Sequence, residues 1–197
     1  MRMLLMGPPG AGKGTQATRL SSTLTVPQIS TGDIFRANVS EGTELGRTAQ
    51  SYMDAGEYVP DEVTNAMVRD RLNADDTRPG FLLDGYPRTL DQVRTLDEIL
   101  SEQGTALDAV VELSVDAEEL IERLLNRAQE SGRADDSEDV IRHRQEVYVE
   151  QTAPLIETYQ QRGLLVRVDG MGHVDSVAER IMRALGERGI GASTESV

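Results

Sequence analysis

Residues Met3 to Thr15 read MLLMGPPGAGKGT, a short apolar segment followed by a loop rich in glycine. From Lys13 onward, small and apolar residues recur at Ala17 and Leu20, a spacing that predicts one face of an amphipathic helix. Glycines let consecutive backbone N–H groups turn toward one anion, and the N-terminus of the following helix adds a positive dipole. The stretch therefore predicts a strand, a phosphate-binding loop and a helix.

Lys13 is the only lysine among the 20 basic residues, and all the others are arginines. A tight phosphate loop needs a compact ammonium on a flexible stem, for which a planar guanidinium is no substitute. A genomic bias against lysine would explain the same scarcity without any function. The loop departs from the general pattern G-x-x-x-x-G-K-[ST], because Gly14 follows the lysine and the hydroxyl comes one place later, at Thr15. We interpret Lys13 as a ligand of the transferred phosphate.

The composition of the chain narrows its class. It has 197 residues, with 34 acidic against 20 basic side chains and a formal net charge of -14, which argues against binding to nucleic acid or to an anionic membrane. No apolar run approaches the roughly 18 residues of a membrane span, and the N-terminus has a core-strand pattern in place of a signal peptide. Without cysteine, neither a disulfide nor a thiolate metal site can form. We expect a cytoplasmic, monomeric protein.

Beyond the loop, short apolar runs alternate with helical patterns. This alternation predicts an α/β fold in three layers, α/β/α, with a five-stranded parallel sheet covered on both faces. Ligands of such sheets bind at the carboxyl ends of the strands, where Gly7 and Asp84 fall. A buried strand that ends in Asp is also where phosphate-loop proteins hold magnesium through water. The expected strands cover residues 3–6, 26–30, 81–83, 109–115 and 164–168.

Several segments depart from this alternation. A helical pair over residues 30–59 is interpreted as an inserted substrate lobe, and Asp61 as the N-cap of the next helix. Residues 126–144 include a polar excursion without an apolar anchor, which predicts a short lid, and Pro154 is expected to bend or break the helix that follows. Residues 186–197 are expected to form a disordered tail. The core then consists of residues 1–29, 60–125 and 145–185.

Five motifs, in this order along the chain, resemble those of the adenylate kinase family. The resemblance covers everything except the tail, and the hydroxyl displaced to Thr15 is the form that this family uses. The absence of cysteine and the brevity of the lid make the chain similar to the short-lid type. The motifs are Gly7–Thr15, Ser30–Arg36, Asp84–Arg88, Gly132–Asp136 and Thr152–Leu155.

The resemblance implies a phosphate-loop core with a small nucleoside-monophosphate-binding insertion, and a reversible transfer of the terminal phosphoryl group of ATP to AMP that gives two ADP. Such chemistry is mostly positioning and charge stabilisation, so cations must surround both polyanions. The implied catalytic residues are Lys13, Arg88, Arg127, Arg133 and Arg144. The implied ATP site is Gly10, Ala11, Gly12, Lys13, Gly14, Thr15, Arg123, Arg127 and Gly172.

The resemblance also implies residues for the second nucleotide and the metal. Gln92 would read the adenine of AMP. Asp84, largely through water, and Thr15 would hold the magnesium that accompanies ATP, and zinc is not expected. The implied AMP site is Thr31, Arg36, Glu57, Tyr58, Val59, Gly85, Tyr86, Pro87, Arg88, Gln92, Arg133 and Arg144.

Plainer interpretations stay open for several of these residues. Thr31 and Asp33 could serve only as an N-cap pair for a helix at Ile34. Gln92 could be only the partner of Thr89 in a T-x-x-Q capping box. Asp84 could end its strand with no metal nearby, and each arginine could be a solvated surface charge. We assign no role to the isolated His143 and His173.

Two other functions also stay open. A pyrimidine nucleoside monophosphate kinase would use the same fold, although those relatives typically lack a threonine at the position of Thr31 and have Asn after the Gly-Tyr-Pro-Arg motif, where this chain has Thr89. A catalytically inactive nucleotide-binding regulator would also share the fold. The intact Lys13 and Asp84, with the complete set of arginines, argue against a loss of catalysis.

Overall fold

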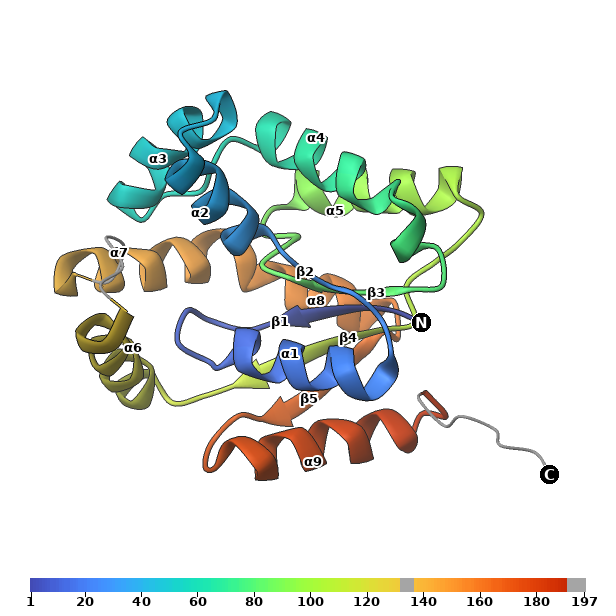
Figure 1. The fold of residues 1–197 in the computed structure, drawn as a ribbon. Helices are drawn as coiled ribbons and strands as arrows, with labels where there is room; N and C mark the ends of the chain where they lie inside the picture. Colours follow the sequence, from blue (N-terminus) through green and yellow to red (C-terminus); the bar gives the residue numbers. More distant parts are fainter. Residues whose placement is uncertain (132–136, 191–197) are drawn as a thin grey trace.

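A computed structural model describes residues 1–131 and 137–190 of the chain. Its centre is a five-stranded, all-parallel sheet with the strand order β2-β3-β1-β4-β5, which confirms the expected fold class (Figure 1). β2 begins later than expected, at Gln28, because Pro27 has no N–H to donate to the sheet, although its carbonyl oxygen accepts from the N–H of Leu82 at 2.9 Å. The strands are β1 (Arg2–Met6), β2 (Gln28–Ser30), β3 (Phe81–Asp84), β4 (Ala109–Ser114) and β5 (Leu165–Asp169).

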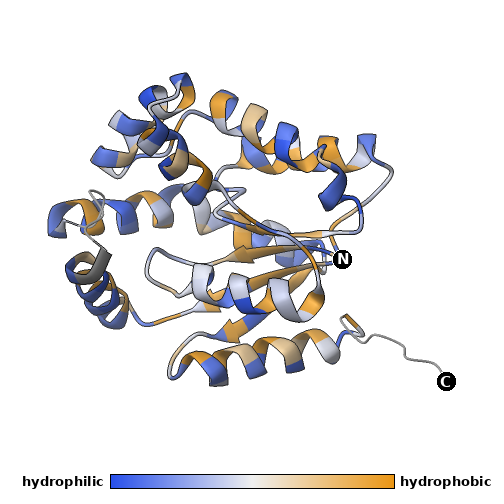
Figure 2. Ribbon diagram, viewed as in Figure 1, coloured by the Kyte–Doolittle hydropathy of each residue, from blue (hydrophilic) through white to orange (hydrophobic). Residues whose placement is uncertain are grey.

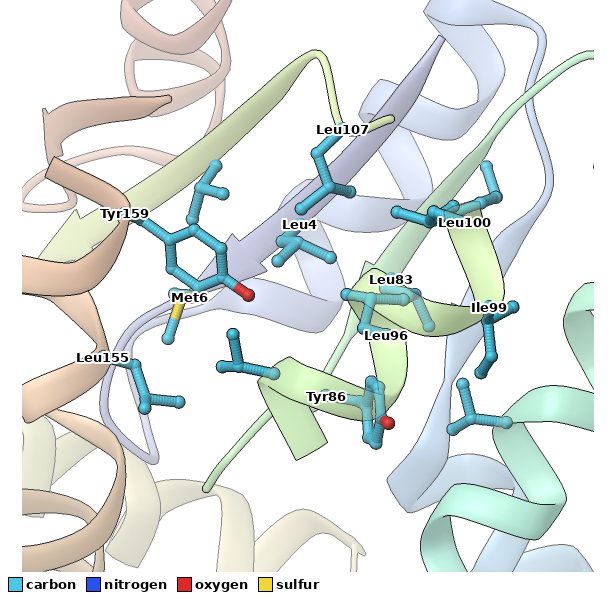
Figure 3. Close-up of a cluster of buried hydrophobic side chains, with 14 of the residues drawn as sticks. Leu4, Met6, Leu83, Tyr86, Leu96, Ile99, Leu100, Leu107, Leu155 and Tyr159 are labelled. Atoms are coloured by element: carbon cyan, nitrogen blue, oxygen red, sulfur yellow. The ribbon is translucent and has the colours of Figure 1, made fainter. Parts of the chain in front are cut away.

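The central strand β1 shows why the sheet is buried on both faces. Successive side chains of a strand point to opposite faces, so Leu4 and Met6 join one hydrophobic cluster while Met3 and Leu5 join another. Figure 3 shows the first cluster, in which Leu4 and Met6 lie near Tyr159 and Leu155. A parallel strand apolar along its whole length is what a sheet covered by helices on both sides requires.

Helices cover the two faces of the sheet (Figure 1). α1 and α9 pack on one face, and α4, α5 and α8 supply the side chains of the cluster on the other face. Figure 2 shows mainly hydrophobic strands beneath helices of mixed hydropathy, as amphipathic helices at a surface should be. These helices are α1 (Lys13–Leu24), α4 (Asp61–Leu72), α5 (Leu90–Glu102), α8 (Pro154–Gln161) and α9 (Val174–Gly186).

The expected inserted pair consists of α2 (Thr31–Glu41) and α3 (Glu44–Ala55), which stand apart from the sheet in Figure 1. They cross closely at Gly46, where a Cβ would lie 2.1 Å from the carbonyl oxygen of Asn38. The pair has its own small hydrophobic cluster, centred on the buried Phe35, with help from α4. The insertion is therefore a lobe with a core of its own, which we call the small lobe.

The C-terminal half follows the expected break at Pro154. α6 (Ala117–Ser131) precedes α7 (Glu138–Val147), which passes through a π-helical turn, Tyr148–Thr152, before α8 begins. Because Pro154 has no N–H to donate to the preceding turn, the helical ladder is interrupted one turn before it. None of the helices in the described ranges is both long enough and apolar enough to cross a membrane.

The end of the chain differs in part from the expected tail over residues 186–197. Gly186 is the last residue of α9, and the backbone N–H of Ile190 donates to the carbonyl of Leu185 at 3.0 Å. Ile190 also packs against the hydrophobic cluster beneath α9, so the ordered chain reaches at least this residue. The remaining expected tail residues, 191–197, lie outside the described ranges, as does the lid segment 132–136.

Candidate active site

The loop between β1 and α1 wraps around the side chain of Lys13. Its Nζ donates hydrogen bonds to the carbonyl oxygens of Gly7, at 2.7 Å, and Pro8, at 2.9 Å. Gly10 has a φ of +87°, and a Cβ there would lie 2.9 Å from the carbonyl oxygen of Leu120, so a side chain at this position is excluded twice over. The loop holds an ammonium at its centre and leaves the N-terminus of α1 pointing at the same space.

The electrostatic surroundings of Lys13 favour an anion beside it. Burial lowers the pKa of Lys13 to about 8, and the positive charges of Arg88, Arg144 and Arg127 act in the same direction, while Asp84 opposes them. An ammonium that is desolvated and surrounded by other cations is stabilised when a polyanion enters. The perturbed pKa therefore marks Lys13 as a functional candidate on physical grounds.

A cavity of about 750 Å³ opens in front of this loop, which we call the main cavity. Six cationic side chains and three acidic ones line it, in a chain whose net charge is -14. Such a concentration of positive charge attracts a polyanionic ligand and opposes the field of the rest of the molecule. The predicted site residues that line the main cavity are Gly10, Ala11, Gly12, Lys13, Gly14, Thr15, Arg36, Asp84, Gly85, Arg88, Arg123, Arg127, Arg144 and Gly172.

Asp84 ends β3 and faces the main cavity beside the first turn of α1. Its exposed fraction is 8%, and burial raises its pKa, an effect that Lys13 and Arg88 oppose. In residues 1–131 and 137–190, no donor forms a hydrogen bond or ion pair with its carboxylate. Thr15 is exposed toward the same cavity. One carboxylate that faces a phosphate loop, with its acceptors available, fits magnesium, which is typically held by one or two carboxylates together with substrate phosphates.

A second cavity, of about 70 Å³, lies between the small lobe and the core, and we call it the base cavity. Arg36, Arg88 and Arg144 line both cavities, so the two spaces meet at three guanidinium groups. The lining of the base cavity also includes apolar side chains of the small-lobe cluster, Phe35 and Val59. The predicted site residues that line it are Thr31, Arg36, Glu57, Tyr58, Val59, Gly85, Arg88, Gln92 and Arg144.

Thr31 has a different local role from the N-cap considered above. Ser30 is the N-cap of α2, and its Oγ accepts from the backbone N–H of Asp33 at 3.2 Å. Thr31 is the first residue of the helix, and its hydroxyl donates to the carbonyl of Gly85 at 2.9 Å. A Cβ on Gly85 would lie 2.8 Å from that hydroxyl oxygen, so the contact requires glycine. The N-cap interpretation of Thr31 was wrong.

Gln92 forms only half of the expected capping box. Thr89 is the N-cap of α5 and accepts from the backbone N–H of Gln92 at 3.2 Å. The side-chain oxygen of Gln92, however, accepts from the N–H of Arg88 at 2.7 Å, one residue before the position that the motif predicts. The amide nitrogen donates to Oδ1 of Asp61 at 2.6 Å. The side chain is only 1% exposed, although it lines the base cavity.

The prediction that Asp61 caps α4 was wrong. Pro60 occupies the N-cap position, and Asp61 is the first residue of the helix. Its carboxylate turns away from the helix and accepts from the hydroxyl of Thr89, at 2.7 Å, as well as from Gln92. An acidic residue between a proline and an apolar helical pattern fits either position, so local sequence could not separate them.

The arginines at the cavities are held by the protein and are not loose surface charges. Arg88 donates from Nε to the carbonyl of Gly85 at 2.8 Å, and its guanidinium carbon lies 4.7 Å from the centroid of the Tyr58 ring. Arg123 donates to Oε1 of Glu119 at 2.7 Å and to the carbonyl of Gly170 at 3.3 Å. Their positions are therefore set before any ligand arrives.

Two predicted site residues, Tyr86 and Pro87, do not line the main or the base cavity. Tyr86 is 1% exposed and packs in the core cluster of Figure 3, where its hydroxyl donates to Oδ1 of Asn65 at 2.9 Å. Pro87 lines, together with Tyr86, a smaller pocket that Lys13, Arg88 and Arg144 also line, so the assignment of these two residues to the AMP site stays a prediction. Arg133 lies outside the described residues.

Other residues that line the cavities were not predicted. Gln16 is buried one turn after Lys13 and donates to the carbonyl of Val174 at 2.9 Å, which ties α1 to the start of α9. A polar residue on the predicted buried face of a helix is unusual, and this feature of the sequence could have indicated that Gln16 has a specific partner. Phe35, Met53 and Thr64 line the base cavity, but their amphipathic spacing also fits an ordinary core.

The geometry first defines a class. A glycine-rich loop around a lysine, at the carboxyl end of the central strand of a parallel sheet and beside an aspartate on the next strand, is the site of a phosphate-loop nucleotide-binding protein. The model of the adenylate kinase family matches residues 5–164. The chain belongs to the adenylate kinase family.

The chain is also similar in sequence to individual adenylate kinases. The chain is 65% identical to the adenylate kinase of Kocuria rhizophila, over 93% of this chain and 98% of the relative. It is 62% identical to that of Leifsonia xyli, over 95% and 94%, and 61% identical to that of Thermobifida fusca, over 95% and 100%. The similarity extends over nearly the full length of both partners in each comparison.

Proposed function

We propose that the chain transfers the terminal phosphoryl group of ATP reversibly to AMP, giving two ADP, with ATP in the main cavity and AMP in the base cavity. One observation carries this proposal: Arg36, Arg88 and Arg144 line both cavities, so the phosphate ends of two nucleotides would meet among three guanidinium groups beside Lys13. Phosphoryl transfer is mostly positioning and electrostatic stabilisation, and this arrangement supplies both.

On the ATP side, the backbone N–H groups of residues 10–15 bind the β- and γ-phosphates, with Lys13 on the transferring group. Arg123, which the carbonyl of Gly170 holds in place, packs on the adenine, and Gly172 contacts the base through its backbone. Arg127 holds the phosphates from the side of α6. Each of these residues lines the main cavity, which supports the assignment.

On the AMP side, Arg36 and Arg88 bind the phosphate at the junction of the cavities. The segment from Glu57 to Val59 contributes backbone contacts, and Gln92 reads the base from the core side. Arg144, which lines both cavities, stabilises the charge that moves between the two nucleotides during transfer. We assign the same task to Arg133, and Tyr86 and Pro87 support the site from behind.

Magnesium accompanies ATP in this proposal. Asp84 would hold it through water, and Thr15 would lie beside it. When bound, the ion neutralises phosphate charge during the transfer. We propose that zinc plays no part, because the chain has no cysteine with which to form a thiolate zinc site.

The protein chain itself has three tasks in the reaction. It orients both phosphate ends with cations that are already placed, it surrounds them with guanidinium and ammonium groups, and it excludes water that would hydrolyse ATP. A monomer meets these needs, because both cavities are built from one chain. We propose that this monomer acts in the cytoplasm.

A coupled assay for ADP tests the proposal, with ATP and magnesium present and AMP, CMP, UMP or GMP added in turn. The proposal expects AMP to be preferred by about a hundredfold or more in kcat/KM, the range that a site with buried hydrogen bonds can reach. A preference for UMP or CMP would instead establish the pyrimidine alternative. An absence of turnover with every acceptor would establish the inactive regulator.

A further inference from the structure

Behind the base cavity, a carboxylate holds the side chain that faces the nucleotide base. The Gln92 amide lies between two fixed partners: its Oε1 accepts from the Arg88 backbone N–H at 2.7 Å, and its Nε2 donates to Asp61 Oδ1 at 2.6 Å. Gln92 lines the base cavity, whereas Asp61 does not. Asp61 therefore stands one layer behind the surface that a base would touch.

The chemistry of the two partners sets the orientation of the amide. A backbone N–H can only donate and a carboxylate can only accept, so the amide oxygen must face Arg88 and the amide nitrogen must face Asp61. The reversed amide would place two donors against each other on one side and two acceptors on the other, and both hydrogen bonds would be lost. The hydroxyl of Thr89 donates to Oδ2 of Asp61 at 2.7 Å and holds the carboxylate in turn.

After these bonds form, the amide keeps one lone pair on its oxygen and one hydrogen on its nitrogen. This pair matches a base edge with a ring acceptor next to an amino group, which is N1 and N6 of adenine, or N3 and N4 of cytosine. Hypoxanthine and guanine carry the opposite pattern, a ring N–H next to a carbonyl, and uracil does too. If the Gln92 amide cannot rotate by 180°, it therefore binds adenine and cytosine and rejects hypoxanthine, guanine and uracil.

We propose that Asp61 is a specificity-determining positioning residue, which selects amino-substituted bases over 6-oxopurines by holding Gln92 in one orientation. This inference rests on the proposed function of Gln92 as the reader of the AMP base. Asp61 touches neither nucleotide, and its contribution passes through the amide. Because adenine and cytosine present the same pattern, Asp61 discriminates against inosine monophosphate and not against CMP.

The test compares Asp61→Ala with Asp61→Asn, using AMP, CMP and inosine monophosphate as acceptors at saturating ATP. In Asp61→Ala, the ratio of kcat/KM for AMP over inosine monophosphate should fall by about tenfold, because one of the two anchors of the amide is gone. The ratio for AMP over CMP should change by less than about twofold, since both bases present the same pattern. The KM for ATP should not change.

Asp61→Asn is the conservative rescue. Its carbonyl can still accept from Gln92, while its amide nitrogen can donate to Thr89, so the ratio of AMP over inosine monophosphate should stay within about threefold of wild type. Asp91→Ala is the matched control, since Asp91 also lies in the first turn of a helix but is exposed and pairs with Arg94 at 3.0 Å. Should Asp61→Ala fail to fold, Asp61→Ser repeats the test with a residue that suits a helix N-terminus.

Two outcomes would overturn the inference. One is an unchanged ratio of AMP over inosine monophosphate in Asp61→Ala, and the other is an Asp61→Asn variant that loses as much of this ratio as Asp61→Ala. Failure of the proposed function looks different: wild-type protein would not phosphorylate AMP, or Gln92→Ala would leave the KM for AMP unchanged. If wild-type protein phosphorylates AMP and Gln92→Ala raises the KM for AMP, but the ratio of AMP over inosine monophosphate is unchanged in Asp61→Ala, then only the inference about Asp61 is wrong.

Discussion

The two cavities are built by different means. The main cavity is built from one continuous loop, from backbone N–H groups and from cations, so nearly everything it needs lies between Gly7 and Thr15 or on a few arginines. The base cavity depends on contacts between residues distant in sequence, such as the side chains of Asp61 and Gln92, or the Thr31 hydroxyl and the Gly85 carbonyl. In our proposal, phosphate binding depends on charge and backbone geometry, whereas base selection depends on the orientation of one amide.

The largest expected effect is at Lys13. Replacing it by Ala removes the ammonium from the centre of the loop, and kcat should fall by about a hundredfold to a thousandfold, the scale at which a transition-state donor is lost. Lys13→Arg should recover little, because a planar guanidinium does not fit the loop. Steady-state kinetics measures both variants. Thermal unfolding is the control: the empty protein should be no less stable, because burial of this ammonium costs stability.

Arg144 tests the junction between the cavities. Arg144→Ala should lower kcat by about a hundredfold, because the lost interaction is strongest in the transition state. Arg142 is the matched control on the same helix: it is exposed and pairs with Glu138 at 2.9 Å, so Arg142→Ala should keep wild-type kcat. Equal losses in the two variants would mean that the helix, and not the cavity-lining guanidinium, accounts for the effect.

Gln92 tests the other side of the comparison. Gln92→Ala should raise the KM for AMP by about tenfold or more and leave the KM for ATP unchanged, since a buried polar contact to one base is lost. Steady-state kinetics with each nucleotide varied separately measures this split. A change in thermal stability with no change in either KM would return Gln92 to a purely structural role at the start of α5.

A pH dependence is expected on the phosphate side alone. The pKa of Lys13 lies near 8 in the empty protein, and ATP phosphates favour the protonated form, so binding raises this pKa. Above pH 8, ATP binding must take up a proton, and kcat/KM for ATP should fall by about tenfold for each pH unit. Calorimetry in buffers of different ionisation enthalpy measures the proton uptake.

The free energy of unfolding should rise with pH, whereas kcat/KM for ATP falls. The folded-state pKa of Lys13 is lower than its ordinary value of 10.5, so the unfolded chain binds this proton more tightly. The cost of keeping the ammonium buried is present below pH 8 and is removed as pH rises from about 8 toward 10. The free energy of unfolding of wild-type protein should therefore gain a contribution in this window that Lys13→Ala lacks. Equal pH dependence in both proteins would contradict the assignment.

The same contrast explains which features could be predicted from the sequence. The phosphate loop and the five-stranded parallel sheet follow from local patterns, because glycine spacing and apolar runs act over a few residues. The role of Asp61 could not be predicted, since its partner Gln92 is 31 residues away and an aspartate after proline looks like an ordinary N-cap. Tyr86 shows the converse: it belongs to a motif of site residues, but the turn after β3 directs its ring into the core.

The most direct measurement is calorimetric binding of two adenosines joined through five phosphates, a ligand long enough to occupy both cavities at once. One molecule should bind per chain, much more tightly than ATP or AMP alone, and it should compete with both nucleotides. Arg88→Ala should weaken this ligand, ATP and AMP together, because Arg88 lines both cavities. Competition with only one of the two nucleotides would contradict the claim that their phosphate ends meet at the three shared arginines.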